Sequence, residues 1–268
     1  MRLAGWILPS FFLFGFSYLP PLSAQVSEET AWQETGRLPS QDAFQAAAAT
    51  PELAFAINSR RITKYDRQSG EPLATSQGEA KHLNSGFLWK GDLYCAHSNY
   101  PETPEISEIK RLDIDTMKLT PFKDFGDYGG SLTWAVRHND TWWCNFAKYG
   151  QDNQSTFLVQ FSDDWEELAR WTYPNTVVQQ LGQYSLSGGL WRSGELLVTG
   201  HDKPEVYRLR LPQTGNELSY LGKQSVPFTG QGIALDPATQ GLVGIVRRAL
   251  GTSKIVFAIP SASEIEKP

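Results

Sequence analysis

The chain has 268 residues and a formal net charge of −5, a length that suits one or two domains. It contains no run of lysine and arginine residues, so the composition argues against a nucleic-acid-binding protein. Nine tryptophans and ten tyrosines are many for this length, and such side chains either fill the space between packed sheets or line sites for sugars and small molecules.

Residues 1–24 have the features of a secretory signal peptide. Arg2 is their only charged residue, the apolar stretch of residues 3–19 follows it, and the small pair Ser23-Ala24 ends the segment. Cleavage after Ala24 would remove Arg2 and change the net charge from −5 to −6. A permanent anchor is the alternative, since about 17 apolar residues lie near the lower limit for a span. We expect cleavage, which leaves residues 25–268 as one periplasmic or extracellular domain without a membrane attachment.

Five similar segments recur along the mature chain. Each contains a turn, an apolar or small-residue run before it and a β-rich run after it, which together predict a hairpin. Equivalent positions are separated by 40, 49, 54 and 46 residues, which is the length of one four-stranded propeller blade. These positions are Leu53, Leu93, Trp142, Leu196 and Leu242.

The two ends of the chain indicate how the repeats are arranged. The first four repeats continue into a further strand-like segment, whereas the fifth stops at Ile259. Residues 31–37, near the mature N-terminus, form a spare strand. Because closing a ring removes exposed sheet edges, we expect an all-β, five-bladed β-propeller whose last blade is closed by the N-terminal strand. A six-bladed propeller and a β-sandwich are the alternatives.

Residues 40–50 include four consecutive alanines, which by propensity alone would favour a helix. Their place in the repeat instead predicts the inner strand of the first blade, where small side chains suit a crowded channel wall.

Two cysteines in an exported protein suggest a disulfide. Cys95 and Cys144, however, occupy the same position in successive repeats. Packed sheets lie about 10 Å apart, whereas bridged cysteines need Cα atoms within about 4.4–6.8 Å. We therefore predict two free, buried thiols.

Residues that could carry chemistry gather where inner strands begin and second strands end, because these segments meet at one mouth of the channel. His82, His97 and His201 lie in them, whereas His138 lies in a turn at the opposite end. The three histidines could bind a divalent metal. Alternatively, His82 or His201 could act as a general base, with Asp202 as its orienting partner. A purely structural role for the histidines is the third interpretation.

Other polar and aromatic side chains occur in the same segments. The neutral groups would suit hydroxyls or a Ca²⁺ ion, the arginines a carboxylate or phosphate, and Trp134 and Tyr184 a ring or sugar. The alternative is that they cap strand ends or form a solvated rim. These candidate ligand-binding residues are Asn84, Ser85, Asn99, Thr133, Ser187, Gln231, Arg247, Arg248 and Trp134, together with His97.

Several of these segments resemble a family of exported bacterial propeller-like proteins, associated with planctomycetes and similar bacteria. The resemblance covers nearly all of the mature chain and rests on residues 81–86, 94–101, 130–134, 197–202 and 230–233. Some members carry a cycloisomerase label, which implies chemistry that forms or opens lactones. The family supplies no catalytic residues to transfer to this chain. Five-bladed glutaminyl cyclases are a second analogue, although we find none of their motifs.

The sequence leaves open whether the protein is an enzyme. The first hypothesis is a lactonase- or cycloisomerase-type enzyme that acts on a small polar metabolite. The second is a non-catalytic propeller that recognises a sugar, a peptide or a cell-surface partner, and the third is a structural envelope protein. We expect a monomer with a polar ligand site at one mouth of the channel, and no nucleic-acid or membrane partner.

Overall fold

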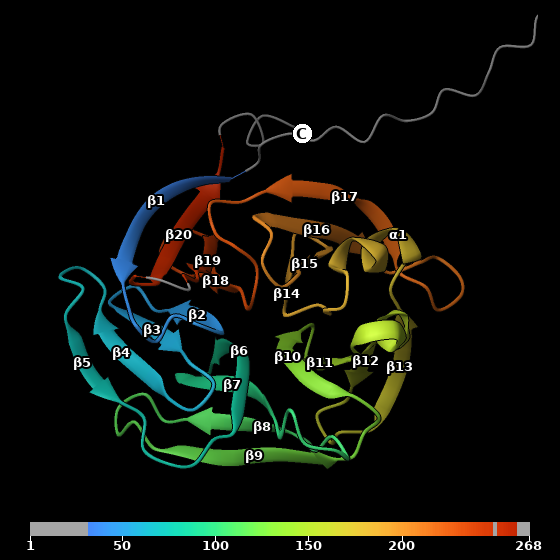
Figure 1. The fold of residues 1–268 in the computed structure, drawn as a ribbon, viewed down its shortest axis with the longest axis horizontal. Coiled ribbons are helices and arrows are strands. Elements are labelled where there is room, and N and C mark those ends of the chain that lie inside the picture. The colour runs from blue at the N-terminus through green and yellow to red at the C-terminus, as the bar shows by residue number, and fades with distance from the viewer. Residues whose placement is uncertain (1–31, 249–250, 262–268) are drawn as a thin grey trace, which may run out of the picture.

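Five four-stranded antiparallel sheets stand around a central axis in the computed structural model, which describes residues 32–248 and 251–261 (Figure 1). Each sheet is one blade, and in the first four blades the strands run outward in chain order. The strands of blades one and two are β2 (Ala46–Ala49), β3 (Leu53–Ile57), β4 (Ile62–Asp66), β5 (Pro72–Thr75), β6 (His82–Trp89), β7 (Asp92–Ser98), β8 (Ser107–Leu112) and β9 (Leu119–Gly126). Those of blades three and four are β10 (Ser131–His138), β11 (Thr141–Ala147), β12 (Phe157–Phe161), β13 (Glu167–Thr172), β14 (Gly188–Arg192), β15 (Glu195–Thr199), β16 (Glu205–Arg210) and β17 (Ser219–Ser225).

Blade five is assembled from both ends of the chain. Its strands, from the axis outward, are β18 (Ala234–Asp236), β19 (Gly241–Val246), β20 (Lys254–Pro260) and β1 (Trp32–Pro39). β1 pairs antiparallel with β20 along its whole length, so the blue and red ends of the ribbon lie side by side in Figure 1. The five-bladed prediction, including closure by an N-terminal strand, is confirmed. Six blades and a sandwich are excluded.

The predicted hairpin turns have the geometry that joins twisted strands. Lys90 and Gly91, and likewise Ser193 and Gly194, all have positive φ angles between an inner and a second strand. Such two-residue turns match the twist of the flanking strands. Within the described residues, helical structure is limited to connections: the 3-10 turns Gly150–Ser155 and Gln179–Leu181 and the short helix α1 (Asn175–Val178).

The alanine run forms the inner strand β2, as the repeat predicted, and every residue of it is fully buried. Ala46 and Ala48 pack with residues of blade two, whereas Ala47 and Ala49 pack with Val243 and Ile245 of blade five. Small side chains allow both neighbours to approach, and this packing outweighs the helix propensity of alanine.

Both cysteines are free and buried, which confirms the sequence prediction. Cys95 and Cys144 belong to different hydrophobic clusters between blades. Burial raises the pKa of both thiols well above the ordinary value, so neither is activated as a nucleophile.

The expected signal peptide, residues 1–24, lies outside the described residues. No helix in the described ranges is long and apolar enough to cross a membrane.

Hydrogen bonds join each blade to the next around the mouth where the inner strands begin. Backbone or side-chain donors from one blade reach a carbonyl of its neighbour at all five junctions. The bonds are Leu83 N to Ser59 O (2.8 Å), Asn84 Nδ2 to Leu132 O (3.0 Å), Thr133 Oγ1 to Leu186 O (2.7 Å), Thr199 Oγ1 to Gln231 O (2.5 Å) and Gly232 N to Gln45 O (2.8 Å).

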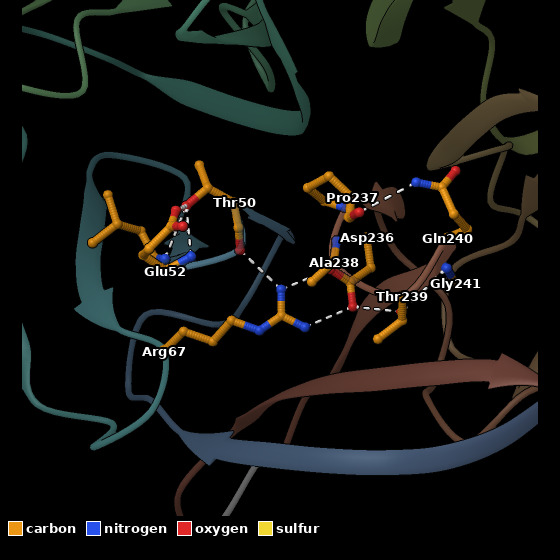
Figure 2. A network of polar contacts seen from close by, with 10 residues as sticks. Thr50, Glu52, Arg67, Asp236, Pro237, Ala238, Thr239, Gln240 and Gly241 are labelled. Carbon is orange, nitrogen blue, oxygen red and sulfur yellow. Dashed lines mark hydrogen bonds and ion pairs between the residues drawn. The ribbon is translucent and has the colours of Figure 1, made fainter.

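A buried ion pair joins the first blade to the last on the opposite face. Arg67, in the turn after β4, contacts both carboxylate oxygens of Asp236 at 2.6 Å, and its Nη1 also donates to Thr50 O (Figure 2). Asp236 is fully buried, and the Arg67 guanidinium lies 4.2 Å from the centre of the Phe257 ring. Burial alone would raise the pKa of Asp236, but hydrogen bonds from Arg67 and Thr239 lower it below the ordinary value. The ion pair thus holds the first and the last blade of the propeller together.

Replacing Asp236 by asparagine should lower the free energy of unfolding at pH 7 by about 3 kcal/mol, because Arg67 loses its buried counter-charge. The carboxylate has a lower pKa folded than unfolded, so its stabilising effect is present above about pH 4 and is lost as the pH falls through the folded pKa. Thermal unfolding of the wild type and Asp236→Asn should therefore differ most at pH 7 and converge toward pH 3. Asp163→Asn, which alters an exposed pair with Arg137, is the control and should change little. An equal difference at both pH values would contradict this role for Asp236.

Candidate functional site

A cavity of about 420 Å³ opens at the mouth where the inner strands begin and the second strands end. Its volume lies in the range of small-molecule sites. Six of the candidate residues line it together: His82, Asn84, Thr133, Ser187, His201 and Gln231. The other lining residues are Gln45, Tyr100, Tyr149, Gly150, Gln183, Tyr184 and Ser185.

One wall of the cavity is a stacked pair from blade four. Tyr184 precedes β14 and His201 follows β15, and their rings lie parallel with centroids 3.9 Å apart. The pair presents an aromatic surface with a phenol hydroxyl and imidazole nitrogens at its edges. Such a surface suits a ring-shaped ligand with polar substituents.

The second wall combines rings from blades two and three. Tyr100 lies 5.1 Å from His82 and 5.7 Å from Tyr149, measured between ring centroids. Burial lowers the pKa of His82, with a smaller effect from His97, and burial raises the pKa of Tyr149. His82 and Tyr149 are therefore uncharged at neutral pH, and this wall is a neutral aromatic surface.

Neutral polar side chains complete the lining between the two walls. Asn84 and Thr133 each donate a hydrogen bond to a carbonyl of the neighbouring blade. The same residues therefore line the cavity and join the blades. No aspartate, glutamate, lysine or arginine belongs to the lining among the described residues. The cavity thus offers neutral hydrogen-bonding groups and aromatic faces, without a fixed charge.

Charged groups lie just behind His201. Asp202 Oδ2 is hydrogen-bonded to His201 Nδ1, and Arg247 Nη2 donates to Asp202 Oδ1 at 2.7 Å. Arg247 Nη2 also lies 3.2 Å from His201 Nδ1. Neighbours in an extended strand would point apart, but the chain bends at residues 201–202 and brings both side chains together. Burial alone would raise the pKa of Asp202, but its bonds with His201 and Arg247 lower it.

His97 lies in a different cavity, of about 660 Å³, and not with His82 and His201. Its Nε2 accepts a hydrogen bond from Lys81 N at 2.9 Å, and its Nδ1 lies 2.9 Å from Glu108 Oε1. Within residues 32–248 and 251–261, no three histidine, cysteine, aspartate or glutamate side chains come together as a metal-binding group. The structure thus does not assemble the three histidines that the metal hypothesis used.

Four more candidates lie outside the mouth lining. Trp134 is fully buried between blades three and four, where β10 has a bulge at residues 132–134. Ser85 is buried against Gly232. The Asn99 side chain holds its own loop by bonds to Pro104 O and Ile106 N, and Arg248 is exposed.

Six lining residues were not singled out from the sequence: Gln45, Tyr100, Tyr149, Gly150, Gln183 and Ser185. Tyr100 and Tyr149 follow the second strands of blades two and three, and Gln45 directly precedes β2. Their position in the repeat could have identified Tyr100, Tyr149 and Gln45, because the other candidates come from equivalent positions at strand ends.

No family model matches the chain, and no curated protein matches it. Among solved structures, the glutaminyl cyclase of Myxococcus xanthus is similar with a TM-score of 0.57 and 11% identity, over 87% of this chain and 99% of that one. A chain of the mitotic checkpoint complex matches with a TM-score of 0.47 and 9% identity, over 96% of this chain and 100% of that one. At 11% identity, the likeness to the glutaminyl cyclase shows the propeller fold alone. The more specific resemblance to an exported bacterial family stays a prediction.

Replacing Arg247 by methionine should raise the pKa of Asp202 toward its ordinary value, because the carboxylate loses one of its two stabilising partners. A pH titration of the Asp202 carboxyl carbon by NMR would measure this. Arg248→Met, at the neighbouring exposed position, is the matched control and should leave the titration unchanged. An unaltered Asp202 pKa in Arg247→Met would contradict the proposed contact.

Proposed function

We propose that this chain is an exported β-propeller that binds a small, uncharged, hydroxylated ring compound of the sugar class at its polar mouth. The observation that carries the proposal is the combination of two aromatic walls with a lining that has no fixed charge. Aromatic faces pack against the apolar faces of a sugar ring, and neutral amides and hydroxyls bond its substituents. Export rests on the signal-like residues 1–24.

The walls fit this ligand class better than a flat partner. Tyr184 and His201 come from blade four and Tyr100 and Tyr149 from blades two and three, and all four line the same cavity, so a ring compound bound there can contact aromatic side chains from more than one blade. Asp202 and Arg247, two charged groups next to His201, are paired with each other. A carboxylate or phosphate ligand would therefore find no free counter-charge in the lining.

Replacing Tyr184 by alanine should weaken binding of a neutral monosaccharide about tenfold, because one stacking wall is lost. Saturation-transfer NMR with glucose, galactose and their N-acetylamino derivatives would identify a ligand and rank its affinity. Tyr220→Ala, on the outer strand β17, is the control and should leave affinity unchanged. Absence of binding by all four sugars, or binding of glucuronate in preference to glucose, would overturn the proposal.

The second candidate function is an enzyme of lactonase or cycloisomerase type that acts on a small polar metabolite. The contact between His201 and Asp202 favours it, since a carboxylate that holds Nδ1 leaves Nε2 as the basic nitrogen. In lactone hydrolysis, water would attack the carbonyl carbon while His201 takes its proton. The ring C–O bond would then break, and the proton would pass to the leaving oxygen.

If this second function holds, His201→Gln should lower the rate of lactone opening at least about 100-fold, because the general base is lost. Acid release from glucono-1,5-lactone, followed with a pH indicator and corrected for the spontaneous rate, measures it. His138→Gln, on the opposite face, is the control. No acceleration by the wild-type protein would remove the enzyme from consideration and leave the binding function.

A further inference from the structure

Gln231 carries a buried donor at the mouth that no protein group uses. It lies just before β18, lines the cavity and is 3% exposed. In the described part of the chain, its buried Nε2 has no hydrogen-bond partner. A buried donor without an acceptor is destabilising, so such groups are rare unless a function requires them.

The backbone holds Gln231 in place from both sides. Its N–H donates to Gly200 O at 2.9 Å, and its carbonyl accepts from Thr199 Oγ1 at 2.5 Å. Its φ is 61°, in the left-handed region that non-glycine residues seldom adopt. Neither neighbour could carry a side chain: a Cβ on Gly230 would lie 2.7 Å from Gly200 O, and one on Gly232 would lie 2.8 Å from Ser85 Cα. The backbone of Gln231 is thus held at the mouth at a conformational cost.

Gln45 provides a comparison within the same cavity. It too is buried and lines the mouth, but its Nε2 donates to Ser59 Oγ at 3.1 Å. Asn84 and Thr133 are likewise bonded to neighbouring blades. Among the buried lining amides of the described residues, Gln231 is therefore the one whose nitrogen has no partner in the protein.

The unpaired amide nitrogen of Gln231 needs an oxygen that accepts a hydrogen bond. A ligand hydroxyl could accept but would also bring a proton that needs an acceptor of its own, whereas a carbonyl oxygen only accepts. We propose that Gln231 is a specificity-determining residue that donates from Nε2 to a carbonyl oxygen of the bound ring compound.

This inference rests on the proposed sugar-class function and narrows it. A neutral sugar ring with a carbonyl-bearing substituent, such as an acetamido group, would stack between the aromatic walls and accept from Gln231. The parent sugar, which has a hydroxyl at that position, would lack this bond.

The first test needs no ligand and compares two glutamines. Gln231→Met removes an unpaired buried donor while it keeps the shape, so the melting temperature should stay the same or rise by about 2–4 °C. Gln45→Met removes a satisfied donor and should lower the melting temperature by about 2–4 °C. A fall for Gln231→Met as large as that for Gln45→Met would show that Gln231 is a structural residue and overturn the inference.

The second test compares N-acetylglucosamine with glucose by titration calorimetry. The wild type should bind N-acetylglucosamine about tenfold more tightly, and Gln231→Met should abolish this preference while it still binds glucose. Gln231→Leu, which also loses the donor and adds no charge, should give the same result if the methionine variant folds poorly. Equal affinities for both sugars in the wild type would overturn the inference and leave the proposed function standing. Failure of both sugars to bind would count against the proposed function itself.

Discussion

The structure depends on closing the ring. Blade five lacks an outer strand until β1 pairs with β20, and the ion pair between Arg67 and Asp236 fixes the junction of blades one and five from the opposite face (Figure 2). A sheet array left open would expose two unpaired edges. Closure places all five inner strands around one axis, and every feature of the mouth follows from this arrangement.

Residues of the mouth both join neighbouring blades of the propeller and line the cavity. Asn84 and Thr133 bond to the next blade, and the segment of residues 229–232 reaches across to Gly200 and Gln45. A site built this way is rigid before any ligand arrives, which reduces the entropy lost on binding. Gln231 differs from these residues, since its backbone is hydrogen-bonded to blade four while its side-chain amide nitrogen is unpaired.

Much of the fold could be predicted from the sequence because blade-length spacing and turn residues are local signals. The closing strand was predicted at residues 31–37 and runs from Trp32 to Pro39. The site was predicted less completely, since repeat position gives the face but not the direction of each side chain. Thr133 lines the mouth while Trp134 beside it enters the core, and bulges in β6 and β10 alter that alternation. The contact of His201 with Asp202 depends on a bend of the chain at residues 201–202, and the identities of these two residues do not predict that bend.

The central claim, that a ligand enters between the two aromatic walls, can be tested by fluorine NMR of protein labelled with 3-fluorotyrosine. Each resonance would be assigned by a Tyr→Phe variant, and the protein titrated with N-acetylglucosamine. Our account predicts shifts for Tyr100, Tyr149 and Tyr184, which line the mouth, and none for the buried Tyr94 and Tyr207. Unchanged resonances for the three mouth tyrosines, at a sugar concentration that saturates binding, would contradict it.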